Sequence, residues 1–401
     1  MEERPVLILG AGLAGLSGAY HLEGHRQAVI LEREDRVGGL TRSFHVQGFT
    51  FDLTGHLLHL RRPEVKKLVA RLLPDGMAPI ERNSFIYSHG RYTDYPFQAN
   101  LHGLPPGVIR DCLVGLAETL AHKMPSRREA LASGSFRDWV LGTFGRGIAE
   151  HFMFPYNRKL WCTDLNDVTA EWVSWSVPQP VFEEVVGGAL GLKNRGMGYN
   201  PVFQYPVSGG IEVLPEALAA ALRRTRVHLK TEVCSVDSGT RRVRTVDGRV
   251  WPYSTLISTL PLPRLLKLLV QPPDWIAAVA RSLRATSVVN INLGVARSDL
   301  TRRHWIYFPE EEFVFYRVGS PTAFCQASAP PGCSSLYVEV ARLGLQPGEL
   351  PGLVDRVKKD LLRCGLLRAD DSIAAQQVTV IHPAYVIFDR HRQACLPRVL
   401  D

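Results

Sequence analysis

The chain has 401 residues, 45% hydrophobic and 21% charged, which indicates a globular protein of about two domains with a sizeable core. The formal net charge is +8, but the lysines and arginines are scattered without a basic block, which argues against nucleic-acid binding. The seven cysteines form no C-x-x-C pair, and no apolar run reaches the roughly 18 residues that span a bilayer. With the first strand beginning near Pro5, no leader is expected either. We expect reduced thiols, no metal site, no membrane span and a cytoplasmic location.

A βαβ unit opens the chain. Residues 6–9 are a short, continuous apolar run that predicts a buried parallel strand, and residues 28–31 predict a second one. A helix to about Leu22 follows the glycine-rich turn between them.

That turn has the spacing of a dinucleotide-binding loop. Gly10 permits a tight turn, Gly12 lets the backbone approach a pyrophosphate, and Gly15 allows close packing of helix and strand. Glu32 ends the second strand, 17 residues after Gly15, where a carboxylate accepts a hydrogen bond from a ribose hydroxyl. The free N–H groups at the start of the helix then face the phosphates, so the unit predicts a bound dinucleotide.

The rest of the chain alternates between helical and strand patterns. Helices are predicted over residues 64–73, 108–122, 136–144, 213–224 and 353–364. A hairpin is predicted over residues 85–92, and strands over 227–236, 255–259, 288–295 and 305–308. We therefore expect an α/β protein with a discontinuous cofactor domain, 1–60 and 205–264, and a helical insert with the first part of a substrate domain, 61–204. A second mixed sheet, 265–380, and a return towards the cofactor domain, 381–401, complete the expected organisation.

The segment after Glu32 favours FAD over NAD. Arg36-Val37-Gly38-Gly39 resembles the second glycine pair of the large FAD family that includes amine oxidases, protoporphyrinogen oxidase and UDP-galactopyranose mutase. The stretch over residues 229–233, followed by residues 256–261, is also similar to that family, in which the backbone at the position of Val233 meets the adenine. The resemblance implies a Rossmann-like FAD-binding domain of the glutathione-reductase type. It assigns the cofactor to Gly10, Gly12, Leu13, Ala14, Gly15, Glu32, Arg33, Gly38, Gly39, Leu40, Gly55, His56 and Val233.

Further segments resemble the UDP-galactopyranose mutase branch of this family. Gly55-His56-Leu57-Leu58-His59 is similar to its G-x-H-x-F-H segment, whose first histidine sits beside the reacting edge of the flavin. The other matching segments are Tyr95-Pro96-Phe97-Gln98-Ala99-Asn100-Leu101, Pro155-Tyr156-Asn157-Arg158-Lys159-Leu160-Trp161, Gly198-Tyr199-Asn200, Trp305-Ile306-Tyr307-Phe308-Pro309-Glu310, Phe315-Tyr316-Arg317 and Ala384-Tyr385.

The resemblance assigns a substrate site to these segments. Tyrosine hydroxyls and arginine donate to phosphate oxygens, flat aromatic faces hold a base or sugar ring, and amides read hydroxyls. The implied substrate residues are Tyr95, Phe97, Gln98, Asn157, Trp161, Asn200, Tyr307, Tyr316, Arg317 and Tyr385.

The mutase resemblance implies a redox-neutral isomerisation between pyranose and furanose forms of a nucleoside diphosphate sugar. It implies reduced FAD, with NAD(P)H as the expected reductant, and a covalent sugar adduct at flavin N5. His56 is then expected to orient the flavin edge or a water. Arg297, one place from a diphosphate-binding arginine of the mutases, is expected to stabilise the leaving diphosphate.

Two departures keep other functions open. Ser176 stands where the mutases carry a diphosphate-clamping arginine, for which Arg195 or Arg297 could substitute. The family also has a further C-terminal segment with a G-R-x-G motif, and nothing in this sequence matches it. The alternatives are a FAD-dependent oxidoreductase of the protoporphyrinogen oxidase or amine oxidase type, and a non-catalytic flavin or nucleotide-sugar binder. The sugar, the nucleotide, the pathway and the oligomeric state stay open.

Overall fold

The first sheet is parallel and buried on both faces. The computed structural model describes residues 4–74, 76–121, 134–192 and 201–400, and its four-stranded sheet has the order β13-β1-β2-β9. The strands are β1 (Val6–Leu9), β2 (Ala28–Leu31), β9 (Arg226–His228) and β13 (Thr255–Ser258). Successive side chains of a strand point to opposite faces, so both faces of this apolar sheet need a cover.

Each face of this sheet has its own cover. Val6 and Ile8 pack under the helices α1 (Leu13–Leu22) and α8 (Val213–Ala221). Leu7 and Leu9 face a three-stranded antiparallel sheet of β10 (Val233–Asp237), β11 (Arg242–Thr245) and β12 (Val250–Pro252). The apolar run over residues 6–9 is continuous because alternate side chains of β1 are buried on opposite faces of the sheet.

The single strand predicted over residues 227–236 was wrong. The chain leaves the parallel sheet after His228, and Lys230 takes a left-handed φ of 50°. Lys230 N donates to Glu34 O and Thr231 N to Glu32 O, so this crossing holds the loop that follows β2. Alternation alone could not reveal that its two halves belong to different sheets.

The second sheet is mixed and has seven strands in the order β18-β14-β17-β16-β15-β6-β7. They are β6 (Ser84–Ser88), β7 (Arg91–Asp94), β14 (Ser287–Val295), β15 (Trp305–Tyr307), β16 (Arg317–Gly319), β17 (Ser334–Arg342) and β18 (Ile373–Ile381). Helix α11 (Leu350–Arg363) covers the face of β14 that carries Ile291 and Leu293. On the other face, Asn290 and Asn292 each donate to the carbonyl of Asp52. The predicted α/β class, with a parallel sheet and a second mixed sheet, is confirmed.

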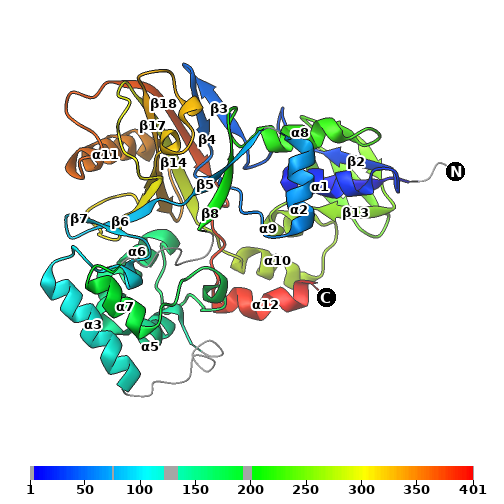
Figure 1. Cartoon of the computed structure of the whole chain (residues 1–401). Helices are drawn as coiled ribbons and strands as arrows, with labels where there is room; N and C mark the ends of the chain where they lie inside the picture. Colours follow the sequence, from blue (N-terminus) through cyan, green and yellow to red (C-terminus); the bar gives the residue numbers. More distant parts are fainter. Residues whose placement is uncertain (1–3, 75, 122–133, 193–200, 401) are drawn as a thin grey trace.

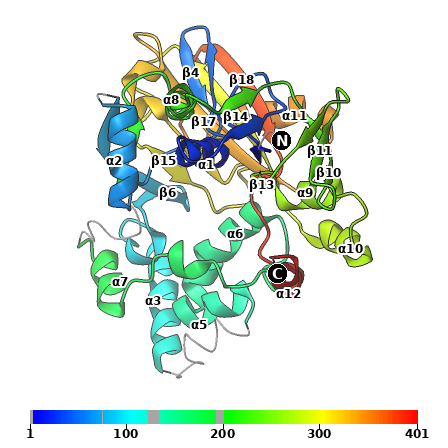
Figure 2. The ribbon, with the colours of Figure 1, turned by 90° about the vertical axis from the view of Figure 1, so that its right-hand side faces the viewer.

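Helices form a third part, set below both sheets (Figure 1 and Figure 2). It comprises α3 (Pro106–Ala121), α5 (Phe136–Ile148), the π-helical turn η2 (Ala149–Met153), α6 (Phe154–Trp161) and α7 (Phe182–Ala189). Helices α3 and α5 touch backbone to backbone, because a Cβ on Gly147 would lie 2.1 Å from the carbonyl oxygen of Asp111. Glycine is thus required at this crossing.

Smaller elements join the three parts. Two antiparallel pairs form separate two-stranded sheets: β3 (Ser43–Val46) with β4 (Phe49–Asp52), and β5 (Met77–Glu81) with β8 (Val202–Pro206). The remaining helices are α2 (Pro63–Leu72), α9 (Leu262–Leu268), α10 (Asp274–Ser282) and α12 (Arg390–Leu400). Short 3-10 turns occupy Phe97–Ala99, Val173–Trp175, Pro321–Ala323, Gln326–Ser328 and Pro347–Glu349. Among the described residues, no helix combines the length and apolarity needed to cross a membrane.

Candidate active site

A cavity of about 1010 Å³ runs along the carboxyl ends of the parallel strands. Most of the residues predicted to bind the cofactor line it: Gly10, Gly12, Leu13, Ala14, Glu32, Arg33, Gly38, Gly39, Leu40 and Val233. Gly15 lies behind the turn, where a Cβ would fall 1.9 Å from the carbonyl oxygen of Gly10. Gly55 and His56 do not line this cavity and lie nearer the second sheet.

The two glycine turns are stacked on each other at the cavity wall. Gly12 and Gly38 form a parallel bridge, and a Cβ on Gly39 would lie 3.2 Å from the Cα of Gly12. Gly10, Gly38 and Gly39 all have positive φ values, 100°, 110° and 58°. A Cβ at Gly10 or Gly38 would also lie within 3 Å of a neighbouring side chain, so both turns require glycine. Their backbone lines the cavity and fits a pyrophosphate that needs close approach.

Glu32 is held rigidly at the end of β2. Its Oε2 accepts from Ala11 N at 2.7 Å and its Oε1 from Glu34 N at 2.9 Å. A carboxylate has about four lone-pair positions, so these two bonds leave capacity for a ribose hydroxyl. This arrangement fits the adenosine ribose of FAD.

Basic side chains that sequence reasoning missed complete the cavity. Arg42, Arg264, Lys267 and Arg281 all line it. Arg264 pairs with Glu232 at 2.6 Å, and Arg42 lies 3.5 Å from Glu34. Lys267 and Arg281 form no ion pair with any described residue, so they leave the outer wall positively charged. Because they come from α9 and α10, far along the chain from the glycine turns, only the net positive charge hinted at them.

Five tyrosines from separate segments meet beside the second sheet, and we call them the tyrosine cluster: Tyr95, Tyr156, Tyr307, Tyr316 and Tyr385. Their ring centroids are 5.4 Å apart for Tyr95 and Tyr307, and 5.5 Å for Tyr156 and Tyr307. Tyr316 lies 6.2 Å from Tyr156 and 6.5 Å from Tyr385. The structure therefore brings together four predicted substrate residues, Tyr95, Tyr307, Tyr316 and Tyr385, from motifs up to 290 positions apart, and adds Tyr156 from the matching segment over residues 155–161.

A buried ion pair underlies the tyrosine cluster. Arg317 Nε and Nη2 bind the two carboxylate oxygens of Glu339 at 2.9 and 2.7 Å, and Glu339 is fully buried. Tyr316 donates its hydroxyl to the same carboxylate, and Gly55 N lies 3.4 Å from it. Burial opposes the charge of Arg317, but Glu339 and the surrounding tyrosines hold its pKa well above the ordinary value.

Glu339 was not predicted from the sequence. It lies on β17, in register with Asn290 of β14 and Arg317 of β16. In the sequence, the apolar residues 336, 338 and 340 alternate with other residues, which indicates a strand but does not indicate that Glu339 is buried.

His56 lies in the loop that Gly55 ties to Glu339. Burial lowers the pKa of His56 below its ordinary value, while Asp52 and Glu339 act in the opposite direction. Its Nδ1 is buried and finds no hydrogen-bond partner among the described residues. A buried polar atom without a partner is rare and suits contact with a ligand or water.

Several predicted substrate residues use their polar atoms inside the protein. Gln98 Nε2 donates to Pro178 O at 2.6 Å, and Trp161 Nε1 donates to Asn157 Oδ1 at 3.2 Å. Phe97 is fully buried and stacks on Phe152. Phe152 in turn stacks on Tyr156, so Phe97 lies one ring behind the tyrosine cluster. The predicted contact at Asn200 lies outside the described residues.

The prediction for Arg297 needs correction, because the structure separates it from the tyrosine cluster. Arg297 lies two residues past the end of β14 and forms a bidentate pair with Asp371, at 2.8 and 2.9 Å. Arg317 sits level with Asn290, seven positions earlier along that strand. The near match to a mutase arginine in sequence position could not reveal that Arg297 lies beyond the site, beside Asp371.

The C-terminal segment connects the cofactor cavity with the tyrosine cluster. His382 and Pro383 line the cavity, and Tyr385 contacts Trp161 and Tyr316. Thr286 N donates to Tyr385 O, which anchors this segment to the start of β14. The two candidate subsites are therefore adjacent.

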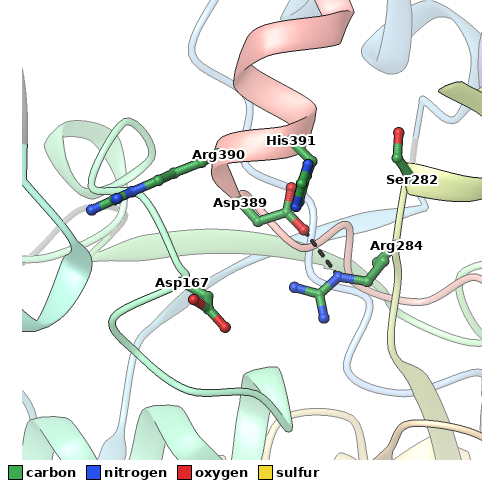
Figure 3. Close-up of a pocket in the computed structure, with 6 residues that line it drawn as sticks. All are labelled: Asp167, Ser282, Arg284, Asp389, Arg390 and His391. Carbon is green, nitrogen blue, oxygen red and sulfur yellow. Dashed lines mark hydrogen bonds and ion pairs between the residues drawn. The ribbon is translucent and has the colours of Figure 1, made fainter.

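A smaller cavity of about 420 Å³ lies where α10, α12 and the helical part meet (Figure 3). Arg284 binds Asp389 at 3.0 Å, and Asp389 also accepts from Arg392 N at the start of α12. Thr169 N donates to Phe388 O, which joins the helical part to the segment just before Asp389. We interpret this cavity as a structural junction, because its central carboxylate is already bound.

The sequence profile described as flavin containing amine oxidoreductase matches residues 13–360. The chain belongs to this family. Coproporphyrinogen III oxidase of Mycobacterium leprae (strain TN) is 28% identical over 328 residues, covering 74% of this chain and 68% of that protein. Protoporphyrinogen oxidase 2, chloroplastic/mitochondrial, of Arabidopsis thaliana is 23% identical over 267 residues, covering 59% of this chain and 51% of that protein.

The solved structures include a close match in fold. The crystal structure of reduced UDP-galactopyranose mutase superposes with a TM-score of 0.93 and 27% identity, covering 99% of this chain and 86% of that one. A putative protoporphyrinogen oxidase from Exiguobacterium sp. 255-15 gives a TM-score of 0.72 at 16% identity, covering 99% and 92%, which shows the fold alone. The predicted flavoenzyme superfamily is therefore confirmed, and the family implies FAD as cofactor.

Proposed function

We propose that this protein is a FAD-dependent isomerase that interconverts ring forms of a nucleoside diphosphate sugar. The observation that carries the proposal is the tyrosine cluster over Arg317, which lies next to the cofactor cavity. Tyrosine hydroxyls and a guanidinium suit phosphate oxygens, and the flat rings suit a sugar or base. The likeness to reduced UDP-galactopyranose mutase over 99% of the chain supports the same reading.

The chain's own groups have definable roles in such a reaction. Arg317 uses Nε and Nη2 for Glu339, and its Nη1 donors bond to no described residue, so they are free to meet a diphosphate. Glu339 fixes the direction of those donors before substrate arrives, which lowers the cost of ordering them. His56, kept neutral by burial, is placed to hold a proton or orient a water at Nδ1. When bound in its reduced form, FAD supplies the nucleophile and is recovered unchanged at the end of the cycle.

The test is an assay with the flavin reduced by dithionite under anaerobic conditions. A panel of UDP-, GDP- and dTDP-hexoses is added, and products are followed by chromatography and NMR. We expect a furanose product only when the flavin is reduced, and the panel names the sugar and the nucleotide. Reduction by NADH and NADPH, followed from the flavin absorbance, tests the expected physiological reductant. Absence of product from every member of the panel would count against the proposal.

A second candidate function is oxidation of a porphyrinogen. It is favoured by the sequence relatives, since coproporphyrinogen III oxidase shares 28% identity over 328 residues. Incubation with coproporphyrinogen III or protoporphyrinogen in air distinguishes it, because an oxidase produces a fluorescent porphyrin and peroxide at a rate that rises with enzyme concentration above the spontaneous oxidation. Binding of a nucleotide sugar without product in either assay would instead support a non-catalytic binder.

Lys267 and Arg281, the two cavity cations that pair with no acid among the described residues, give a prediction about FAD. We expect the double variant Lys267→Gln/Arg281→Gln to bind FAD roughly ten-fold more weakly. Each exposed cation contributes up to about 1 kcal/mol to the free energy of binding an anion. The measurement is fluorescence titration of the apoprotein at two salt concentrations, where the variant should show a smaller salt dependence. Riboflavin, which lacks phosphates, should bind both proteins equally. Lys66→Gln/Lys67→Gln on α2 is the matched control, since it removes the same charge away from the cavity.

A further inference from the structure

Lys159 on α6 turns its amine towards the segment that follows β15. Its Nζ donates to Phe308 O at 2.7 Å and to Glu310 O at 2.9 Å. An ammonium bound to two carbonyls makes stronger hydrogen bonds than a neutral donor does. These bonds therefore join two elements of different parts of the fold, a helix of the helical part and a strand end of the mixed sheet.

Both joined elements carry a tyrosine of the cluster. Tyr156 lies three residues before Lys159, on the preceding turn of α6, and Tyr307 comes immediately before Phe308. The two rings meet edge to face, with an interplanar angle of 85° and centroids 5.5 Å apart. The hydroxyl of Tyr307 also accepts from Trp305 Nε1 at 2.9 Å, which ties the ring to its own strand. The placement of one ring against the other thus depends on how α6 is held against the end of β15.

We propose that Lys159 is a positioning residue, whose charged amine fixes the end of β15 against α6 and thereby sets Tyr307 against Tyr156. Lys159 does not belong to the tyrosine cluster, and no described contact brings it to the cofactor cavity. The proposal concerns the geometry of the candidate site and does not depend on which reaction that site catalyses.

The surroundings of the amine make this tie sensitive to pH. Burial lowers the pKa of Lys159 to about 7, while Glu310, Asp360, Glu311 and Glu312 act in the opposite direction. The other charged or titratable groups on the elements packed here include Arg158 on α6, Glu339 and Arg342 on β17, and His89, His151, Tyr87, Cys162, Arg356 and Arg363. Loss of the proton as pH rises through about 7 leaves only neutral hydrogen bonds to the two carbonyls. We therefore expect the pair of rings to loosen on the alkaline side.

The experiment places a 3-fluorotyrosine at Tyr156 in the full-length holoprotein and follows its fluorine resonance by NMR through the neutral pH range. Burial raises the pKa of Tyr156 well above its ordinary value, so the label's own hydroxyl does not titrate there. We expect the resonance to shift with a midpoint of about 7 in the wild type. In Lys159→Arg, which stays charged, the resonance should keep the position of the acidic limb at every pH. In Lys159→Met it should not titrate.

Three outcomes overturn the proposal, two in Lys159→Arg and the wild type and one in the histidine controls. The first is a titration with the same midpoint in Lys159→Arg, a variant that retains the charge and donors and so keeps the test valid if Lys159→Met fails to fold. The second is a wild-type resonance that does not move with pH. The variants His89→Gln and His151→Gln serve as controls and should retain the titration. If either abolishes it, a histidine and not Lys159 controls the rings.

Discussion

Glu339→Ala is expected to lower the free energy of unfolding by roughly 3–5 kcal/mol, as breaking a buried ion pair from one side does. The carboxylate is fully buried and binds Arg317 through two hydrogen bonds of 2.9 and 2.7 Å. Its removal leaves the guanidinium without a counter-charge and the Tyr316 hydroxyl without its acceptor. Chemical denaturation of the wild type and the variant measures the loss.

Matched variants separate the charge from the shape. Glu339→Gln keeps the side-chain volume, so a loss close to that of Glu339→Ala assigns the effect to the unpaired guanidinium. Replacing both partners, as Arg317→Met/Glu339→Leu, should recover much of the stability, because a well-packed apolar pair of similar volume replaces a buried ion pair at little cost. Glu150→Ala, which breaks the exposed pair with Arg146, should change stability little. A double variant as unstable as Glu339→Ala would contradict this account.

Activity should respond differently from stability in this series. If Arg317 holds a diphosphate, Arg317→Met/Glu339→Leu recovers the fold but loses substrate affinity. A variant that is stable, yellow and weak in substrate binding would therefore place Arg317 in contact with substrate, whatever the reaction proves to be.

Local signals sufficed for the cofactor unit. Gly10, Gly12 and Gly15 constrain each other over six positions, and the strand before them is apolar because both faces of its sheet are covered. The chemistry of this turn is contained in its own residues, so the turn could be predicted without knowing the rest of the fold.

The substrate side depends on long-range register, which motifs do not carry. Glu339 occupies a polar position between apolar residues of an alternating strand, which in the sequence is typical of a solvent-facing side chain. In the structure, the candidate site covers that face of the sheet. The prediction that Arg297 binds the diphosphate failed for a related reason. Arg297 lies two positions beyond the end of β14, where its side chain binds Asp371 and not the tyrosine cluster. A motif match also cannot tell a side chain that faces the pocket from one behind it, as Gln98 shows.

The glycine turn gives the second large prediction. We expect Gly15→Ala to weaken FAD binding by roughly five- to hundred-fold, the range that an overpacking strain of about 1–3 kcal/mol represents if the turn must move. The new methyl group would lie 1.9 Å from the carbonyl oxygen of Gly10 and 3.1 Å from its carbonyl carbon. Both are backbone atoms of the turn that faces the phosphates, so no side-chain rotation can relieve the contact. The flavin-to-protein ratio after purification and titration of the apoprotein with FAD measure the effect.

Gly18→Ala is the matched control, on the same helix and three residues further on. A Cβ there meets nothing within 4 Å, so the substitution should leave FAD affinity unchanged. It should also raise stability by about 0.5–1 kcal/mol, because alanine loses less backbone entropy than glycine in a helix. If Gly15→Ala and Gly18→Ala bind FAD equally well, the strain at Gly15 is absorbed by movement of α1, and the close packing of turn and helix is not needed for the cofactor. If only Gly15→Ala loses FAD, the packing beneath the turn, and not helix propensity, controls the approach of the backbone to the phosphates.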